Sequence, residues 1–429
     1  MAPGRKASGP DAAGWDGAPC AGLRGPLAGV RVIDLTAVLM GPFATQILGD
    51  MGADVVKVES PQGDTVRGIG PFRHPGMGCI FLQGNRGKRS VVLDLKKPAG
   101  RQAMLRLVKG ADVLVYNVRP QAMARLGLTY EAVSAVNPGI VYAGLFGYDQ
   151  RGPYADRPAY DDLIQGAVGL PTLAEMAGGD RPRYVPLAIA DRYVAVMGVT
   201  AILGALFHRA NTGRGQRVDV PMFETMAQFI LGDHMGGRTF DPPLGPPGYK
   251  RSLSPERMPY RTRDSYLCVL AYNDKQWRSF FAAIGRPELP DADPRFADMA
   301  SRTVHINALY ALLADILSTR TTAEWFAILD AADIPVMPLH TLDSLIDDPH
   351  LAAIGFLQTV EHPTEGRIRS IGVPTLWSET PATPGRPAPL LGEHSIEILG
   401  EAGYLAAEID ALVADGVTVD GGARLQAGT

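Results

Sequence analysis

The sequence has few cysteines, little net charge and no long apolar run. Its 429 residues include three cysteines, Cys20, Cys79 and Cys268, which lie far apart. This spacing argues against a disulfide framework and against a cysteine-rich metal site, so we expect no metal and a reducing compartment. Lysine and arginine number 41 against 45 acidic residues, which gives a net charge of −4. We therefore expect no nucleic acid partner, because the chain has no global basic field.

The longest apolar stretch, residues 194–207, is too short to cross a membrane, which requires about 20 apolar residues. Charged or basic residues bound it at both ends, including Arg192 and His208. We therefore expect a buried helix and no membrane partner. Residues 1–26 are rich in Ala, Gly and Pro and lack the apolar core of a signal peptide. We expect a disordered leader on a cytoplasmic protein.

Strands and helices alternate through the first part of the chain. Short apolar runs predict strands at 30–35, 54–59, 90–95, 112–116 and 140–145. Intervening segments predict helices at 42–51, 98–109 and 129–136. This alternation is typical of an α/β fold, with a parallel sheet covered by helices. In such a sheet, ligands bind beyond the carboxyl ends of the strands.

A second region begins near Phe229. Residues 241–248 form a Pro/Gly cluster that predicts a loop or linker. Residues 275–345 then favour helices, and a strand is predicted near 265–271. The proline-rich stretch 377–391 is predicted to cross back to the first domain.

The common cofactor motifs are missing. Residues 41–46 lack the second and third glycines of a dinucleotide fingerprint, which nearly excludes an NAD-dependent dehydrogenase. Residues 85–90 resemble a P-loop only superficially, because Arg89 follows Lys88 where serine or threonine is required. Neither a G-x-S-x-G nucleophile elbow nor an H-E-x-x-H zinc motif occurs in the sequence.

Cations and amides cluster where the predicted strands end. Such groups can neutralise a phosphate-rich ligand. They are equally typical of a solvated rim of surface charge, and the residue pattern leaves both interpretations open. The cluster comprises Lys57, Lys88, Arg89, Lys96, Lys97, Asn117, Arg119 and Arg125.

Several blocks occur in a fixed order along the chain. One reads Leu48-Gly-Asp-Met-Gly-Ala-Asp-Val-Val-Lys-Val-Glu59, and the others are 30–35, 41–44, 88–96, 111–120, 125–127, 212–220 and 392–399. Over about residues 27–403 the sequence thereby resembles the class III CoA-transferase family, which includes formyl-CoA transferase, carnitine CoA-transferase and α-methylacyl-CoA racemase.

The resemblance implies a Rossmann-like large domain with a parallel sheet, a smaller inserted α+β domain and an interlocked homodimer. On this basis we predict a large CoA-binding domain that starts with residues 27–225 and a small domain over 226–345. Residues 346–429 are predicted to return and complete the large domain. Coenzyme A is implied as a substrate, carried as acyl-CoA, and no permanently bound cofactor is expected.

Carried over position by position, the resemblance assigns CoA contacts to Val38, Leu39, Leu93, Lys96, Asn117, Arg119, Arg125 and Tyr160. Cations at Lys96 and Arg125 suit phosphate oxygens, and the amide and apolar residues suit adenine or pantetheine. Leu39 and Phe146 stand where formyl-CoA transferase has glutamine and lysine, which disfavours a formyl or oxalyl substrate.

The resemblance places the catalytic carboxylate at Asp191. Family transferases pass the acyl group through an aspartate as a mixed anhydride, and an aspartate is expected to be ionised at neutral pH. Asp191 precedes the apolar run 194–207, so it would lie at a helix N-terminus, which favours an anion. Alternatively, Asp191 only caps that helix. Asp161 and Asp180 are further candidates.

The resemblance therefore implies an acyl-CoA:carboxylate CoA-transferase with a free carboxylic acid as second substrate, the acyl group being dicarboxylic. An acyl-CoA racemase is one alternative, but its histidine partner is replaced by Asp156, and no histidine lies between His74 and His208. A non-catalytic CoA-binding protein, which would retain Lys96 and Arg125, is the other alternative.

Overall fold

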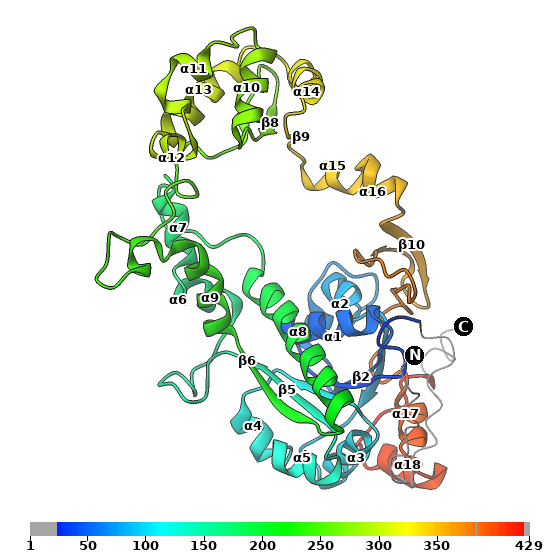
Figure 1. Cartoon of the computed structure of the whole chain (residues 1–429). Coiled ribbons are helices and arrows are strands. Elements are labelled where there is room, and N and C mark those ends of the chain that lie inside the picture. Colours follow the sequence, from blue (N-terminus) through cyan, green and yellow to red (C-terminus); the bar gives the residue numbers. More distant parts are fainter. Residues whose placement is uncertain (1–23, 383, 424–429) are drawn as a thin grey trace, which may run out of the picture. The chain divides into compact units, whose positions relative to one another are not determined.

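The computed structural model describes residues 24–382 and 384–423, so residues 1–23 of the predicted leader lie outside the described part. Contacts divide the chain into two compact units (Figure 1). Among the described residues, the first unit comprises 24–164, Ala188–Met226, 351–382 and 384–423. The second comprises Gln165–Leu187 and Ala227–His350.

The first unit contains a six-stranded parallel sheet, which confirms the predicted α/β class. The strands are β1 (Arg31–Leu35), β2 (Asp54–Glu59), β3 (Lys88–Val92), β4 (Val113–Tyr116), β5 (Val141–Phe146) and β6 (Gln216–Pro221). Their spatial order is β3-β2-β1-β4-β5-β6, and every neighbouring pair is parallel. Strand order reverses between β1 and β4. In open parallel sheets, such a switch point is where ligands bind.

Helices cover both faces of this sheet, so its central strands are buried almost throughout. Helices α3 (Pro98–Lys109), α5 (Tyr130–Val136), α17 (Ser395–Glu401) and α18 (Ala406–Ala414) share one apolar core with the strands. Helix α1 (Met40–Asp50) packs against α8 (Ile189–Thr212), and α8 lies along β5 and β6 (Figure 1).

Helix α8 contains the apolar run that the sequence analysis interprets as a buried helix. By length and composition alone, it is the one helix in the described part of the chain that could span a membrane. Its Val194, Gly198 and Ile202 are buried, and a Cβ atom at Gly198 would lie 2.9 Å from the Leu145 side chain of β5. This close contact with the sheet is typical of a core helix in an α/β protein.

The first unit also contains shorter elements, and two further helices begin in it and end in the second unit. The shorter elements are η1 (Thr65–Gly68), α2 (Cys79–Gly84), α4 (Pro120–Arg125), β10 (Leu357–His362) and β11 (Gly366–Ile371), and the two helices are α6 (Asp161–Ala167) and α9 (Met222–His234). The chain rejoins the first unit at Leu351, so the stretch 377–391 lies within this unit and does not connect the two units as predicted. Its Pro389 carbonyl accepts a hydrogen bond from Arg67, at 3.2 Å.

The second unit combines helices with a small antiparallel sheet. The strands β7 (Tyr260–Arg261), β8 (Tyr266–Val269) and β9 (Val336–Pro338) lie in that order. The helices are α7 (Leu170–Met176), η2 (Gly236–Thr239), α10 (Asp274–Ala283), α11 (Leu289–Ala292), η3 (Pro294–Phe296), α12 (Met299–Val304), α13 (Ile306–Leu317), α14 (Thr322–Ala331) and α15 (Leu342–Ile346). Helix α16 (Pro349–Ala353) follows. Trp277, Phe280 and Phe281 are central to the core.

Residues 165–187 belong to this second unit, although the sequence analysis assigned them to the large domain. The buried Gln165 closes the segment on itself: its Oε1 accepts from the Val185 N–H at 3.0 Å, and its Nε2 donates to the Leu187 carbonyl at 3.3 Å. A Cβ atom at Gly178 would lie 2.7 Å from Pro255, which shows how closely the segment packs in this unit.

Arg89 joins the C-terminal helix α17 to the sheet. Its guanidinium is almost fully buried and forms ion pairs with Asp54 at 2.7 Å and with Glu397 and Glu401 at 2.8 Å. A buried cation that is fully paired is not available to a ligand. The interpretation of Arg89 as a phosphate-binding or surface cation is therefore wrong.

We predict that Arg89→Met lowers the free energy of unfolding by about 2–3 kcal/mol, because it removes the charged hydrogen bonds that join α17 to the sheet, while Asp54 and Glu401 keep their ion pairs with Arg31. Urea denaturation followed by circular dichroism measures this loss. The control is Glu397→Gln, whose half-exposed side chain is screened by solvent and is expected to cost less than about 1 kcal/mol. Equal losses in the two variants would contradict the assignment of Arg89 as the central ion-pair partner.

Candidate active site

Two clefts open at the carboxyl ends of the central strands. The first, of about 310 Å³, is lined by residues that follow β1, β4 and β5 and by the start of α8. The second, of about 420 Å³, is lined by residues that follow β1, β2, β3 and β4. Ala37 and Val118 line both clefts, so the two clefts adjoin at the switch point between β1 and β4.

Most of the predicted site residues come together in these clefts. The first cleft is lined by Val38, Leu39, Asn117, Arg119, Tyr160 and Asp191. Leu93 and Lys96 line the second cleft. Among the predicted residues that the structure describes, Arg125 lines neither cleft, and it lies exposed in the last turn of α4.

Asp191 lies in the first turn of α8, as the sequence predicts for a residue just before the apolar run. The residue at the N-cap position is Ala188, whose methyl side chain cannot accept a hydrogen bond. Instead, the Asp161 carboxylate accepts a hydrogen bond from the Asp191 backbone N–H at 2.9 Å. Asp161 therefore supplies the cap that the alternative interpretation assigned to Asp191. Both aspartates line the first cleft.

The environment of Asp191 disfavours its charged form. Burial raises the pKa of the Asp191 carboxyl to about 7, the negative charge of Asp161 adds to this effect, and Arg192 opposes it. The Arg192 guanidinium lies over the Phe43 ring, 4.3 Å from the ring centroid. The expectation that this aspartate is fully ionised at neutral pH is therefore wrong. A partly desolvated carboxylate that titrates near neutrality is typical of a catalytic group.

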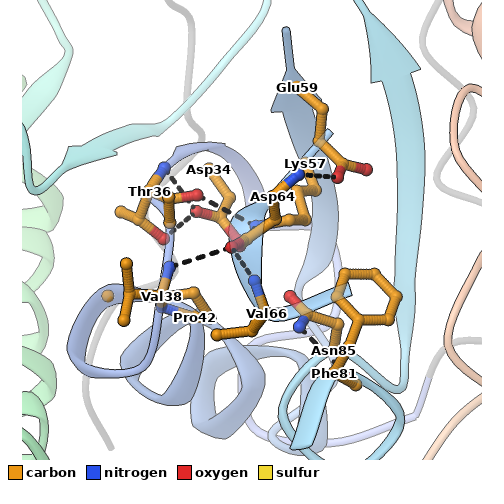
Figure 2. Close-up of polar contacts among 12 residues, drawn as sticks. Asp34, Thr36, Val38, Pro42, Lys57, Glu59, Asp64, Val66, Phe81 and Asn85 are labelled. Carbon is orange, nitrogen blue, oxygen red and sulfur yellow. Dashed lines mark hydrogen bonds and ion pairs between the residues drawn. The ribbon is translucent and has the colours of Figure 1, made fainter. Parts of the chain in front are cut away.

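A buried network of charges lies beneath the turn that connects β1 to α1 (Figure 2). Lys57 donates to the Thr36 carbonyl and to Asp64, each at 2.9 Å. Lys88 donates to Asp34 at 2.9 Å and to the Pro42 carbonyl at 2.8 Å. Both lysines are fully buried, so their interpretation as surface or phosphate-binding cations is wrong.

The ion pairs keep this network charged. Although burial alone would raise the pKa of the Asp34 carboxyl, the neighbouring Lys88 and Lys57 lower that pKa to about 2. The Thr36 and Thr45 hydroxyls also donate to the Asp34 carboxylate, at 2.5 and 2.7 Å. The carboxylate therefore fixes the start of the turn at Thr36.

Asn117 holds the next residue of the turn. Its Oδ1 accepts from the Ala37 N–H at 3.0 Å, and its Nδ2 donates to the Ala37 carbonyl at 2.7 Å. The amide predicted to contact adenine or pantetheine is therefore engaged with the protein backbone. Asn117 shapes the cleft by holding Ala37 in place.

The remaining cations of the sequence cluster differ in exposure. Lys97 donates to the Asp415 and Gly416 carbonyls, at 2.5 and 3.2 Å, and so attaches the C-terminal segment. Lys96 and Arg119 are exposed at the second and first cleft respectively. These two side chains are placed to meet an anionic ligand.

The alternative nucleophile Asp180 belongs to the second unit. Its exposed carboxylate pairs with Arg183 at 3.1 Å, and Asp180 is absent from the described residues that line the first cleft. The described part of the chain also contains no group of three or more His, Cys, Asp or Glu residues arranged to hold a metal.

The sequence analysis did not identify Asp34 and Asp64 as part of the site. One signal in the sequence could have indicated the network. Asp34 and Lys57 interrupt apolar runs that predict strands of a parallel sheet, and such strands are buried on both faces. A charge in that position must find a buried partner of opposite sign.

Comparison with known proteins identifies relatives along most of the chain. The model of CoA-transferase family III matches residues 27–395. A succinate–glutarate CoA-transferase from Agrobacterium fabrum is 35% identical over 88% of this chain and 95% of its own length. A succinyl-CoA:mesaconate CoA-transferase from Haloarcula hispanica is 34% identical over 88% of this chain and 97% of its own.

Solved structures share the fold. The crystal structure of a CaiB/BaiF family protein from Brucella suis is 32% identical to this chain, with a TM-score of 0.74. The similarity covers 88% of this chain and all of the Brucella chain. The structure of Rv3272 from Mycobacterium tuberculosis is 31% identical, also with a TM-score of 0.74, over 87% of this chain and 99% of that chain.

Proposed function

This chain belongs to CoA-transferase family III and is a CoA-transferase, and we propose that it moves coenzyme A between a dicarboxylic acyl-CoA and a free carboxylic acid. The observation that carries the mechanism is the placement of Asp191. Its carboxylate lies at the first turn of α8, in a cleft at the switch point of the sheet, where burial makes it titrate near neutrality.

The relatives support the dicarboxylic substrate class. Those from Agrobacterium fabrum and Haloarcula hispanica are named for succinate, glutarate and mesaconate. In this chain, Arg119 brings a cation to the first cleft. A guanidinium is well suited to bind the free carboxylate of a dicarboxylic acyl group. Lys96 at the second cleft suits the phosphates of coenzyme A.

We assign Asp191 the role of nucleophile. Its carboxylate oxygen attacks the thioester carbonyl of the donor, which forms an Asp191–acyl anhydride and expels CoA thiolate. The thiolate then attacks the Asp191 carbonyl, which gives an aspartyl-CoA thioester and releases the donor acid with one oxygen from the aspartate. The acceptor carboxylate then attacks the aspartyl-CoA thioester, which forms a second anhydride and expels CoA thiolate. The thiolate attacks the acceptor-derived carbonyl of this anhydride, which releases the acceptor as its CoA thioester and restores the Asp191 carboxylate.

Each attack creates a negatively charged tetrahedral intermediate that needs hydrogen-bond donors. Leu39 and Met40 line the cleft at the start of α1, and the N-cap residue Leu39 has an apolar side chain that cannot cap the helix. We assign the oxyanion site to the backbone amides at this end of α1, where the helix dipole also favours negative charge.

Assembly and location are further parts of the proposal. We propose the interlocked homodimer that the family resemblance implies. In such a dimer, substrate specificity would depend on segments of both chains. We also propose a cytoplasmic location, which the three widely separated cysteines support.

We predict that Asp191→Ala lowers kcat for transfer of CoA from succinyl-CoA to glutarate by at least about 10³-fold, because the nucleophile is removed. Chromatography of the acyl-CoA products measures the rate. The control is Asp162→Ala, because Asp162 is an exposed carboxylate of α6 and is expected to leave the rate close to that of the wild type. Retention of transfer in Asp191→Ala would overturn the proposed mechanism.

We predict that kcat/KM, whose pH dependence reports the free enzyme, rises with pH through an apparent pKa near 7. The carboxylate is the nucleophile, so protonation of Asp191 below that pH removes the reactive form. Asp161→Asn should move this acidic limb to lower pH, because it removes a negative charge beside Asp191 and keeps an oxygen to accept the N–H bond. An unshifted limb in Asp161→Asn would show that Asp161 does not influence the titration.

A further inference from the structure

Val38 adopts a backbone conformation that is unfavourable for its side chain. Its φ angle is +70°, and among the residues that the structure describes only Asp333 is another non-glycine residue with positive φ. A β-branched residue in this left-handed region is a genuine outlier, and such strain persists only where the surroundings enforce it. Val38 lines the same cleft as Asp191, so the strain is located at the proposed catalytic site.

Hydrogen bonds restrain each of the three residues of this turn. Asp34 and Lys57 bind the backbone of Thr36, Asn117 binds both backbone groups of Ala37, and the Asp64 carboxylate accepts from the Val38 N–H at 3.1 Å. Of these contacts, the one to Asp64 is made by the strained residue itself. Figure 2 shows the Asp64 side chain between the N–H groups of Val38 and Val66.

Asp64 is itself firmly positioned. Its side chain is 1% exposed, its second oxygen binds the fully buried Lys57 at 2.9 Å, and its backbone N–H donates to Glu59 at 3.1 Å. Asp64 also caps the 3-10 helix η1 by accepting from the Val66 N–H at 3.2 Å. A carboxylate fixed at this many points can hold a backbone N–H in a set position.

We propose that Asp64 is a positioning residue for CoA transfer, one that holds Val38 in the left-handed conformation. This proposal rests on the proposed function of the cleft. The restraint fixes the Val38 side chain and the peptide that leads into α1. If the restraint is lost, a β-branched residue favours negative φ, and the turn moves away from the position that matches the bound thioester.

A double-mutant cycle tests the coupling between these residues. Asp64→Ala should lower kcat/KM by about 10²-fold in the wild-type background, because the acyl-CoA is misplaced relative to Asp191. Glycine adopts positive φ without steric cost, so Val38→Gly removes the need for the restraint. In the Val38→Gly background, Asp64→Ala should therefore cost less than about tenfold in kcat/KM.

Thermal unfolding of the same four proteins separates positioning from stability. We expect Asp64→Ala to lower Tm in both backgrounds, because it leaves Lys57 buried without its partner. If Asp64→Ala does not fold, Asp64→Asn replaces it in both backgrounds, because a single amide oxygen cannot accept from both Lys57 and the Val38 N–H, which bind different oxygens of Asp64. Asp64→Asn is then expected to lose stability in both backgrounds and to lower kcat/KM more in the wild-type background than in the Val38→Gly background.

Two results would overturn the proposal. One is an equal loss of kcat/KM on Asp64→Ala in both backgrounds, and the other is a loss below about threefold in the wild-type background. If Asp64→Asn is used, an equal loss of kcat/KM in the two backgrounds has the same meaning. None of these results bears on Asp191→Ala, so a failure of the positioning role is distinguishable from a failure of the catalytic assignment.

Discussion

The buried ion pairs beneath the turn between β1 and α1 are the constraint on which the candidate site depends. Lys57 and Lys88 arise from β2 and β3, whose residues are all buried, so each lysine must have a buried anionic partner. Asp64 and Asp34 supply those partners. Because the same groups bind the backbone of Thr36, Pro42 and Val38, the pairing of charge also determines the shape of the turn.

The turn matters because of where the sheet places it. β1 lies at the point where strand order reverses, and two clefts adjoin there. Helix α8 brings Asp191 to the same cleft from a distant part of the sequence, and Asp161 caps that helix. The rigid turn and the capped helix together hold a carboxylate that burial makes titrate near neutrality. A carboxylate of this kind is suited to attack a thioester.

Sequence reasoning predicted the sheet well because alternating apolar runs report burial directly. The predicted strands at 54–59, 112–116 and 140–145 agree with β2, β4 and β5 to within one residue. It failed where a residue's role depends on a partner far away in the chain. Arg89 and the two lysines resembled ligand-binding cations until their carboxylate partners were visible, and residues 165–187 were assigned by position along the chain and not by contact. The position of Asp191 followed from the family resemblance, but its raised pKa required knowledge of burial and of Asp161.

The most direct test of the central claim is a search for the covalent intermediate on Asp191. The wild-type enzyme is incubated with succinyl-CoA without acceptor acid and quenched, and its peptides are analysed by mass spectrometry before and after hydroxylamine treatment. The account predicts that CoA is attached to the peptide containing Asp191 and that hydroxylamine converts this residue to a hydroxamate. An enzyme that transfers CoA at the full rate once acceptor acid is added but yields no modified peptide, or modification of a different carboxylate, would contradict it.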